Sequence, residues 1–369
     1  MHYDIVIVGG GPAGSLTALN LEGERVALLE EHQSAGFPAQ CAGLISQDCL
    51  KLLKKYVDAE KFTLNRIDGA YFFSPSGEFA KLRGRSRGVV VERKLMDCEF
   101  IKTCPADVFV KAKVTGVKKD GEEFLVRSVR GNFRASYVVG ADGPSSIVAR
   151  ELGFDRPKVL SAAQVECKMS MDESFVEIYF GYSDFMFGYA VPTGDGFARV
   201  GVVSKSNAIR WLQKLLKEHP SVSKRVDSMK VDEINCGAIP FGLVEFVRGY
   251  AVLIGDSAGM VKPYTGGGLY YLAIAAELLG KHFPDLEKFR EEYMRKLGKE
   301  YAIGMRIAKL YKELSDSDYD YLVRLGKENE ELAESLHMDK PSTLIRVLPL
   351  MLKVVKNPRL AVKIARCLL

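Results

Sequence analysis

Apolar residues at the start of the chain fall into two runs of strand length with a helical stretch between them. Residues 4–8 form the first run, residues 15–21 carry apolar positions at helical spacing, and residues 25–29 form the second run. A buried strand, a short helix and a second buried strand in this order make a βαβ unit with parallel strands. The N-terminal part of the chain therefore predicts an α/β fold with a first domain of the Rossmann type.

The middle of the chain shows a different pattern. Stretches rich in β-branched and aromatic residues are separated by Gly, Pro and Asp, and they lie at 69–73, 176–180, 187–192 and 198–203. This pattern is typical of an antiparallel sheet. We expect the sheet to form an inserted substrate domain of residues 66–85 and 156–244. The Rossmann-type domain would then be discontinuous and consist of residues 1–65, 86–155 and 245–283.

Helical spacing returns at 209–218 and dominates the chain after about Gly267, so we expect a helical C-terminal region over 284–369. Residues 341–369 contain no acidic residue, and Pro349 and Pro358 divide them into short helices. The basic residues of this tail are Arg346, Lys353, Lys356, Arg359, Lys363 and Arg366. The composition predicts weak peripheral binding to anionic membrane surfaces. The alternative is that the tail helices pack on the body with their charges in solvent.

The overall composition indicates an ordinary globular protein. Of 369 residues, 47% are hydrophobic and 27% are charged, and 52 Lys and Arg against 47 Asp and Glu give a net charge of +5. This charge is too small to indicate a nucleic-acid partner. We expect no secretory leader, because an apolar strand starts at Asp4, and no membrane-spanning helix, so the expected location is the cytoplasm.

The cysteines carry no pattern of a metal site. They stand at 41, 49, 98, 104, 167, 236 and 367 and form no CxxC pair, which argues against an iron–sulfur cluster or a structural zinc ion. An odd number of cysteines favours mostly free thiols. A disulfide between 41 and 49, or between 98 and 104, remains an alternative.

A glycine signature follows the first predicted strand. Gly9, Gly11 and Gly14 have the spacing of a dinucleotide-binding turn, in which they permit the tight turn, the approach of a pyrophosphate and the packing of the helix, respectively. Glu30 ends the next strand, where its carboxylate can accept hydrogen bonds from ribose hydroxyls. The alternative is a glycine turn in an α/β protein that binds no nucleotide.

Two later segments favour FAD over NAD. Residues 138–143 and 251–259 each place an acidic residue after a strand, and the second segment continues into Gly266, Gly267, Gly268 and a helix. Asp256 is suited to a ribityl or ribose hydroxyl. The glycine run would let the helix N-terminus approach the pyrimidine end of a flavin, where negative charge develops on reduction.

On these residues the chain resembles FAD-dependent enzymes of the para-hydroxybenzoate hydroxylase superfamily. Within that group it is similar to the geranylgeranyl reductase family, especially the archaeal digeranylgeranylglycerophospholipid reductases. The motifs that carry the resemblance are residues 38–44, 189–194 and 255–268, and it spans about residues 1–280. Val191 and Thr193 depart from the family, which usually has an aromatic residue before Pro192 and a Lys after it. A strand pair around 98–114 is also shortened.

The resemblance implies FAD as cofactor and assigns residues to it. Ala13 would lie at the pyrophosphate, Glu30 at the adenosine ribose and Val114 at the adenine. Contacts to the ribityl chain and the flavin ring would come from Cys41, Ala42, Leu44, Arg93, Asp256, Gly268 and Leu269. The substrate candidates are Phe187, Tyr189, Pro192 and Tyr264, of which Phe187 and Tyr189 are equally compatible with an ordinary sheet core.

The resemblance further implies a reductase that saturates isolated double bonds of geranylgeranyl chains in membrane lipid precursors. Such a reaction needs a hydride and a proton, and we expect Cys41 to donate the proton, with a purely structural flavin contact as the alternative. No second dinucleotide signature is present, so electrons would come from a ferredoxin-like carrier or NAD(P)H. The alternative functions are an aromatic monooxygenase or halogenase, and a non-catalytic prenyl-binding protein.

Overall fold

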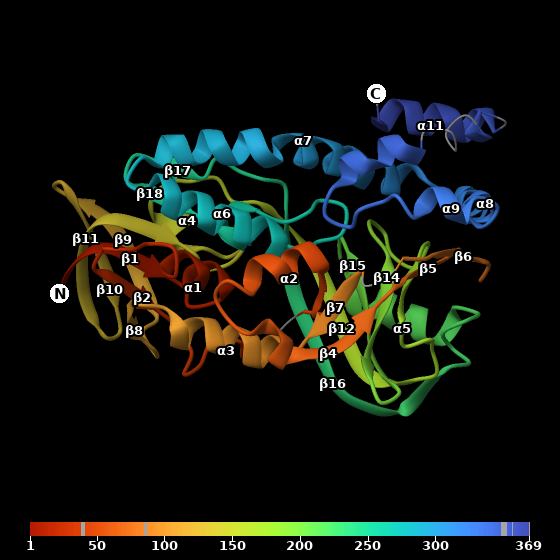
Figure 1. The fold of residues 1–369 in the computed structure, drawn as a ribbon, viewed down its shortest axis with the longest axis horizontal. Coiled ribbons are helices and arrows are strands. Elements are labelled where there is room, and N and C mark those ends of the chain that lie inside the picture. The colour runs from red at the N-terminus through yellow and green to blue at the C-terminus, as the bar shows by residue number, and fades with distance from the viewer. Residues whose placement is uncertain (38–40, 85–86, 348–352, 356, 369) are drawn as a thin grey trace.

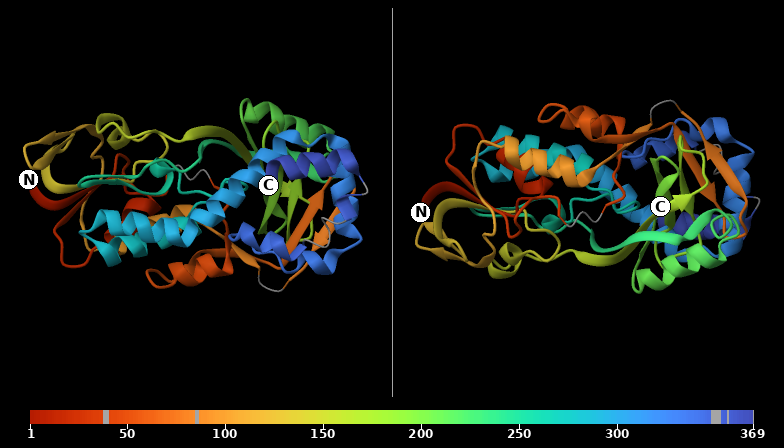
Figure 2. Two further views of the ribbon diagram at one scale, coloured as in Figure 1. Left: turned by 90° about the horizontal axis from the view of Figure 1, so that it is seen from above. Right: turned by 90° about the horizontal axis from the view of Figure 1, so that it is seen from below.

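The computed structural model of the protein describes residues 1–37, 41–84, 87–347, 353–355 and 357–368. A mostly parallel sheet with its helices lies at one end of the molecule and a second, curved sheet lies at the other (Figure 1). The N-terminus lies at the far end of the first sheet and the C-terminus lies over the second (Figure 2). This arrangement confirms the predicted α/β fold. Pro38, Ala39 and Gln40, which begin one of the family motifs, and Pro349 and Lys356 of the basic tail lie outside the described residues.

Eight strands of the described residues form the first sheet. Strands β18, β11, β1, β2 and β8 are parallel neighbours in this order, whereas β17, β9 and β10 pair in antiparallel fashion. Their bounds are β1 (His2–Val8), β2 (Val26–Leu29), β8 (Asp107–Phe109), β9 (Val114–Asp120), β10 (Glu123–Ser128), β11 (Gly131–Gly140), β17 (Val247–Arg248) and β18 (Ala251–Leu253). Residues 5–8 and 26–29 are buried. Both predicted strands are therefore confirmed as central strands, which are apolar because helices or strands cover both faces.

Helix α1 (Pro12–Ala18) starts and ends earlier than the predicted range of 15–21. A proline is favoured at the first helical position, where its missing N–H would have no partner anyway, and Pro12 takes that position. At the other end the Asn20 side chain donates a hydrogen bond to the Leu16 carbonyl at 2.7 Å. Helix α1 packs on α6 (Leu269–His282) so closely that a Cβ atom on Gly280 would lie 2.1 Å from the Asn20 carbonyl oxygen.

Seven strands in the described part of the chain form the second sheet, in the order β16-β12-β15-β14-β13-β5-β6. Their bounds are β5 (Gly69–Phe73), β6 (Phe79–Leu82), β12 (Lys158–Met169), β13 (Phe175–Tyr179), β14 (Gly188–Gly194), β15 (Phe197–Ser204) and β16 (Val226–Phe241). The pairings are antiparallel except for the parallel pair of β13 with β5. Strand β16 is an addition to the predicted stretches, because Asp227, Lys230 and Asp232 interrupt its apolar pattern.

The two faces of this sheet have different neighbours. On one face Leu212 and Leu215 of α5 (Ala208–Glu218) pack into a cluster with Val165, Val200 and other strand residues. The opposite face packs on Ala308 of the long helix α7 (Leu286–Glu313). Because successive residues of a strand point to opposite faces, odd-numbered residues of β15 are turned toward α7 and the first sheet.

A small sheet connects these two parts. Its strands are β3 (Leu44–Ser46), β7 (Gly88–Val91) and β4 (Thr63–Ile67), in this order. Along the chain, α2 (Gln47–Leu53) and a 3-10 turn (Ala59–Phe62) lie between β3 and β4, and α3 (Arg93–Thr103) follows β7. The prediction of a strand pair around 98–114 is wrong for the first part of that range, because residues 93–103 form helix α3. Strand β8 lies in the second part. Helix α3 is stabilised at its start by the Glu92 cap and by the Arg93–Asp97 ion pair at i, i+4 spacing.

The C-terminal region is helical as predicted. After α7 it contains α8 (Asp316–Lys327), α9 (Glu330–Ala333), the 3-10 helix η3 (Pro341–Val347) and α11 (Pro358–Leu368). Two short elements belong to the earlier part of the chain, namely α4 (Ile147–Glu151) and the 3-10 turn η2 (Gly255–Ala258). Leu360 and Ile364 of α11 pack on Leu310 of α7 and Leu325 of α8. The apolar face of α11 is thus covered by the protein, which matches the alternative stated for the basic tail.

Two further expectations concern the whole chain. All seven cysteines are among the described residues and all are free thiols, so neither alternative disulfide is formed. Across the same described residues, no helix combines the length and the apolar character that a membrane span requires.

Candidate functional site

The three signature glycines lie at the turn between β1 and α1, and each has a separate structural reason. Gly9 has φ of +103° and lies against the Ala141 carbonyl, from which a Cβ would be 2.4 Å away. A Cβ on Gly14 would lie 1.9 Å from the Gly9 oxygen, so only glycine lets the helix cross the strand here. Gly11 faces open space, with no atom within 4 Å of its Cβ position. The turn therefore leaves room for a ligand at the start of α1, as the fingerprint requires.

Glu30 lies beside this turn and is buried. One carboxylate oxygen accepts a hydrogen bond from the Gly10 N–H at 2.8 Å, and the other accepts from the His32 N–H at 2.7 Å. Backbone donors thus hold the carboxylate at the end of β2. His32 Nδ1 also lies 2.9 Å from the oxygen that accepts from the His32 N–H, so the oxygen bonded to Gly10 is the one that keeps a lone pair for a further donor such as a ribose hydroxyl. Val114 is near the same end, because the Glu30 carbonyl accepts from the Ala112 N–H at 2.7 Å.

The segment 255–268 closes over the glycine turn. Gly255 has φ of +71°, and a Cβ on it would lie 2.8 Å from the Ala13 Cβ. Asp256 Oδ1 lies 3.6 Å from the Cβ position of Gly268, the residue that precedes α6 and its first residue Leu269. Burial raises the pKa of Asp256 to about 6, while the positive charge of Arg93 acts in the opposite direction.

Cys41 lies in a loop beside Arg93. The Gly43 N–H donates to the Cys41 sulfur at 3.4 Å, and the Arg93 guanidinium also makes a hydrogen bond to this side chain. Arg93 itself forms a bidentate pair with Asp97, at 2.9 Å and 2.8 Å, which together with Cys41 raises the pKa of the partly buried guanidinium. Arg93 therefore connects two predicted residues, Cys41 and Asp256, that are far apart in the sequence.

Arg199 is a site residue that the sequence reasoning missed. This buried arginine of β15 donates to the Ala42 carbonyl at 3.3 Å, to Glu166 at 2.9 Å and to Glu92 at 3.0 Å. A Cβ on Gly43 would lie 2.9 Å from the guanidinium, so the loop is packed directly on it. A signal was present in the sequence, since an arginine inside the apolar run 198–203 must be solvated or paired.

The substrate candidates separate into two groups. Tyr189 donates to Gln164 Oε1 at 2.9 Å, shares an apolar cluster with Ala42 and Leu44, and interacts electrostatically with Cys41. Pro192 lies on the same strand, where its carbonyl accepts from the Asn65 amide at 3.1 Å. The structure thus brings Tyr189 to the Cys41 loop and keeps Pro192 on its strand.

The other two candidates lie with the C-terminal region. Phe187 packs edge to face on Tyr311 of α7, with ring centroids 6.2 Å apart, and belongs to a core cluster. The Tyr264 hydroxyl donates to the Met338 carbonyl at 2.8 Å, and burial raises the pKa of this tyrosine. These contacts commit both side chains to protein neighbours.

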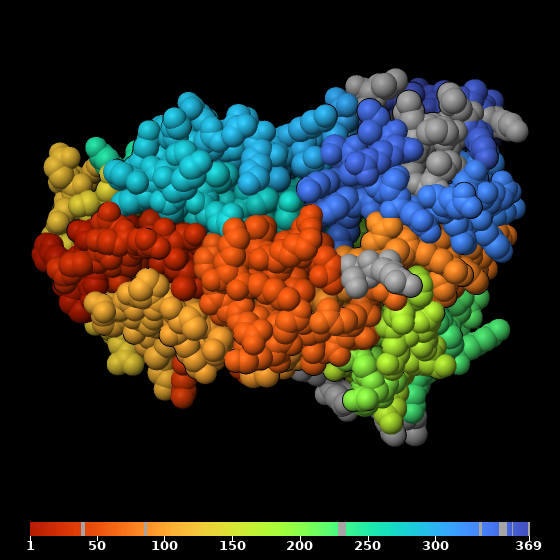
Figure 3. Space-filling view, in the orientation of Figure 1, coloured from red at the N-terminus to blue at the C-terminus, as the bar shows by residue number. Residues whose placement is uncertain are grey.

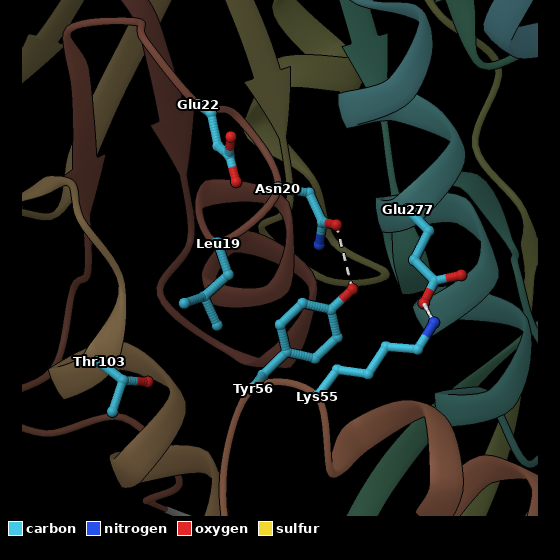
Figure 4. Close-up of a pocket in the computed structure, with 7 residues that line it drawn as sticks. All are labelled: Leu19, Asn20, Glu22, Lys55, Tyr56, Thr103 and Glu277. Atoms are coloured by element: carbon cyan, nitrogen blue, oxygen red, sulfur yellow. Dashed lines mark hydrogen bonds and ion pairs between the residues drawn. The ribbon is translucent and has the colours of Figure 1, made fainter.

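A pocket of about 530 Å³ lies elsewhere, at the opposite end of α1 from Gly11 (Figure 4). Four of its polar side chains are paired: Lys55 with Glu277 at 2.6 Å, and Tyr56 with Asn20 at 3.0 Å. The pocket contains none of the predicted site residues, so the candidate site is the region where Gly11, Glu30 and Asp256 converge.

Comparisons with known proteins agree with this geometry. The family described as "Lycopene cyclase protein" matches residues 4–283. An uncharacterized protein of Methanocaldococcus jannaschii is 30% identical over 96% of this chain and 95% of its own length. Digeranylgeranylglycerophospholipid reductase 1 of Methanosphaera stadtmanae is 31% identical, over 73% of this chain and 72% of that protein.

Solved structures share the fold. A geranylgeranyl bacteriochlorophyll reductase-like protein of Thermoplasma acidophilum superposes with a TM-score of 0.81 at 21% identity, covering 96% of this chain and 99% of that one. The p-nitrophenol 4-monooxygenase of Pseudomonas putida reaches a TM-score of 0.63 at 18% identity, over 98% of both chains. The chain therefore belongs to the lycopene cyclase family and, within it, to the geranylgeranyl reductase-like FAD proteins.

Proposed function

We propose that this protein is an FAD-dependent reductase that saturates isolated double bonds of geranylgeranyl chains in archaeal-type ether lipid precursors. The observation that carries the proposal is the position of the Cys41 loop between Arg93 and an apolar cluster. Cys41 contacts Arg93, while the next residue, Ala42, packs with Leu44, Tyr189 and the small sheet. A flavin site next to hydrocarbon-lined surface suits an alkene better than a polar substrate. Relatives named digeranylgeranylglycerophospholipid reductase support it.

The residues present fit FAD. Gly11 leaves open space at the start of α1, where backbone N–H groups favour a pyrophosphate. Glu30 would accept from the ribose hydroxyls, and Asp256 would accept from a ribityl hydroxyl. Val114 is proposed to lie at the adenine end, with Ala13 at the pyrophosphate and Gly268 and Leu269 at the ring. When bound, FAD would supply the hydride chemistry.

The proton is proposed to come from Cys41. An isolated alkene has no carbonyl that the protein could polarise, so a proton donor near the second carbon is needed. Loss of a proton from the thiol would leave a thiolate next to the Arg93 guanidinium. Tyr264 is a poorer donor because its hydroxyl is already donated to Met338.

The two sheets would divide the work. In this proposal residues 1–65, 86–155 and 245–283 hold the cofactor, residues 66–85 and 156–244 supply the substrate wall, and residues 284–369 cover it. Tyr189 is the wall residue that lies nearest the chemistry, because it interacts with Cys41. Electrons would arrive from a ferredoxin-like carrier or from NAD(P)H.

The direct test uses purified full-length protein with FAD, dithionite and a geranylgeranyl ether lipid, analysed by mass spectrometry. We expect two hydrogen atoms to be added per reduced double bond. An unchanged lipid, with flavin bound and reduced, would contradict the proposed substrate. NADPH-dependent formation of hydroxylated product or peroxide would favour a monooxygenase, and a protein that binds no flavin would favour a non-catalytic prenyl-binding protein.

A further inference from the structure

A buried ion pair lies beneath the glycine turn that precedes α6. Lys262 Nζ and Asp339 Oδ1 are 2.7 Å apart, and the two residues are only 6% and 1% exposed. Lys262 belongs to the segment 255–268, whereas Asp339 comes from the C-terminal region, outside the matched family residues 4–283. A buried ion pair is seldom a net source of stability, since desolvation offsets most of the attraction. Its presence at this turn therefore invites another explanation.

The lysine is built into the turn at both ends of its backbone. Its N–H donates to the Gly267 carbonyl at 3.0 Å, and its carbonyl accepts from the Gly266 N–H at 2.8 Å. The side chain then folds under the turn, so that a Cβ on Gly267 would lie 3.2 Å from Nζ. The positive charge is thus held directly against the glycine run, next to the positive N-terminal end of the 14-residue helix α6.

The aspartate is held from the far side by its own neighbours. The Asp339 N–H donates to His337 Nδ1 at 3.0 Å, its carbonyl accepts from the Tyr271 hydroxyl at 3.3 Å, and Oδ2 has no hydrogen-bond partner although it is buried. A buried acceptor without a partner destabilises the folded protein, because it has lost its hydrogen bonds to water. The carboxylate is therefore retained at a cost, with Lys262 as its main counter-charge.

The segment that carries Asp339 lies against the nucleotide-binding part of the chain. His337 and Lys340 both contact Asp48 of α2, at 3.1 Å and 3.6 Å. In the space-filling view the blue C-terminal region adjoins the orange surface that includes α2 (Figure 3). Cys49, the next residue of α2, interacts electrostatically with Lys262, Asp339 and Arg93. The pair therefore shares one electrostatic environment with the candidate flavin contacts.

We propose that Lys262 and Asp339 are positioning residues that set the reduction potential of the flavin bound against the glycine turn 265–268. The inference rests on the proposed function, which places the flavin there. Reduction adds negative charge to a flavin, so the cation at the turn favours the reduced form and the aspartate behind it moderates that effect. The C-terminal region would thereby control the electron affinity of a cofactor bound by the rest of the chain.

The experiment measures the flavin reduction potential of full-length protein reconstituted with FAD, in Asp339→Asn, Lys262→Met and the double variant Lys262→Met/Asp339→Leu. We expect Asp339→Asn to raise the potential and Lys262→Met to lower it. Each change corresponds to at least about a tenfold shift in the ratio of affinities for reduced and oxidised FAD, or about 30 mV for a two-electron couple. The double variant should lie between them, because both charges are absent. Asp48→Asn, which breaks the other ion contacts of the same segment, should leave the potential unchanged.

A purely structural pair would weaken both redox forms of FAD equally and leave the potential where it is, which would overturn the inference. Shifts of both single variants in the same direction would also overturn it. If a single variant fails to fold, the double variant decides, since apolar replacement of a buried pair is often tolerated. Loss of both redox forms of FAD from the double variant would assign the pair a structural role. Shifted potentials with an unreactive geranylgeranyl lipid would contradict only the proposed substrate.

Discussion

Single buried charges decide much of the chemistry of the candidate site. Asp256 is packed between the end of β18 and the start of α6, and Arg93 is the positive charge that acts on it. Cys41 interacts with the same arginine. Arg93 therefore interacts with both Asp256 and Cys41.

Replacing Asp256 with Asn should stabilise the FAD-free protein at neutral pH. The folded-state pKa is about 6, above about 3.9 in an unfolded chain, so the folded state holds the proton more tightly. Protonated Asp256 does not reduce the free energy of unfolding, so its full contribution is present below about pH 4. As the pH rises to 6 and beyond, the wild type loses about 3 kcal/mol of this free energy. Urea unfolding at pH 4, 5.5 and 7 should show the gap between variant and wild type opening over this range. A gap that is constant with pH would contradict the expectation.

Replacing Cys41 with Ala should leave the fold and the FAD content intact and lower kcat at least about tenfold, which is about 1.4 kcal/mol of barrier. The thiol accepts only one backbone N–H at 3.4 Å and interacts with Arg93, so its loss removes a proton source without opening the core. Single-turnover reduction of a geranylgeranyl lipid is the measurement. Cys98→Ala is the matched control, because Cys98 contacts Ser34 instead. Equal turnover of both variants would show that the proton comes from elsewhere.

At the scale of elements, the glycine turn separates folding from binding. Gly14 lies where α1 crosses β1, whereas Gly11 faces the open space proposed for the pyrophosphate. Two substitutions of the same size should therefore have different consequences.

Gly14→Ala should destabilise the protein severely, since its Cβ would lie 1.9 Å from the Gly9 oxygen and the helix would have to move. Gly11→Ala should keep the melting temperature of the FAD-free protein near that of wild type and weaken FAD binding. Thermal unfolding and flavin titration of both variants distinguish the two effects. FAD affinity unchanged in Gly11→Ala would place the pyrophosphate away from this turn.

Elements far apart in the sequence meet through polar contacts at the junction of the sheets. Arg199 connects β15 to the Cys41 loop and to Glu92, the residue that caps α3. The exact division of the chain into domains stays a prediction, because these contacts cross the proposed boundary. The small sheet of β3, β7 and β4 belongs to this junction and was absent from the expected elements.

For the molecule as a whole, the C-terminal helix acts as a cover. Leu360 of α11 is fully buried against α7 and α8, whereas Val362 of the same helix is 50% exposed. The apolar face that could have entered a membrane is thus occupied by the protein itself.

Leu360→Ala should lower the free energy of unfolding by about 2–5 kcal/mol, through lost burial and the cavity left behind. Val362→Ala, on the exposed side, should change it by less than about 0.5 kcal/mol. Chemical denaturation of both variants checks this. Equal effects would mean that α11 is not packed on the body, and co-sedimentation of wild type with anionic vesicles would then return the tail to its membrane role.

Local features of this protein follow directly from its sequence. Strands β1, β2 and β18, the end of β11, the glycine turn, Glu30 and the loop of Asp256 were predictable, because periodicity and glycine spacing reflect forces between residues close along the chain. Helix α1 differed by one turn because Pro12 starts it, and β16 was missed because charges interrupt its pattern. Resemblance to a known family added the proposed cofactor contacts, which patterns alone do not specify.

Only the tertiary structure determined which charged residues, distant in the sequence, pair with each other. Arg199 meets Glu92 from 107 residues away, and Lys262 meets Asp339 from 77 residues away. From the sequence alone, Arg199 and Lys262 are charged residues that could pair with any of many opposite charges. Folding chooses the partner, because a charge that the packing of sheets and helices removes from water must find its counter-charge among the few groups buried with it.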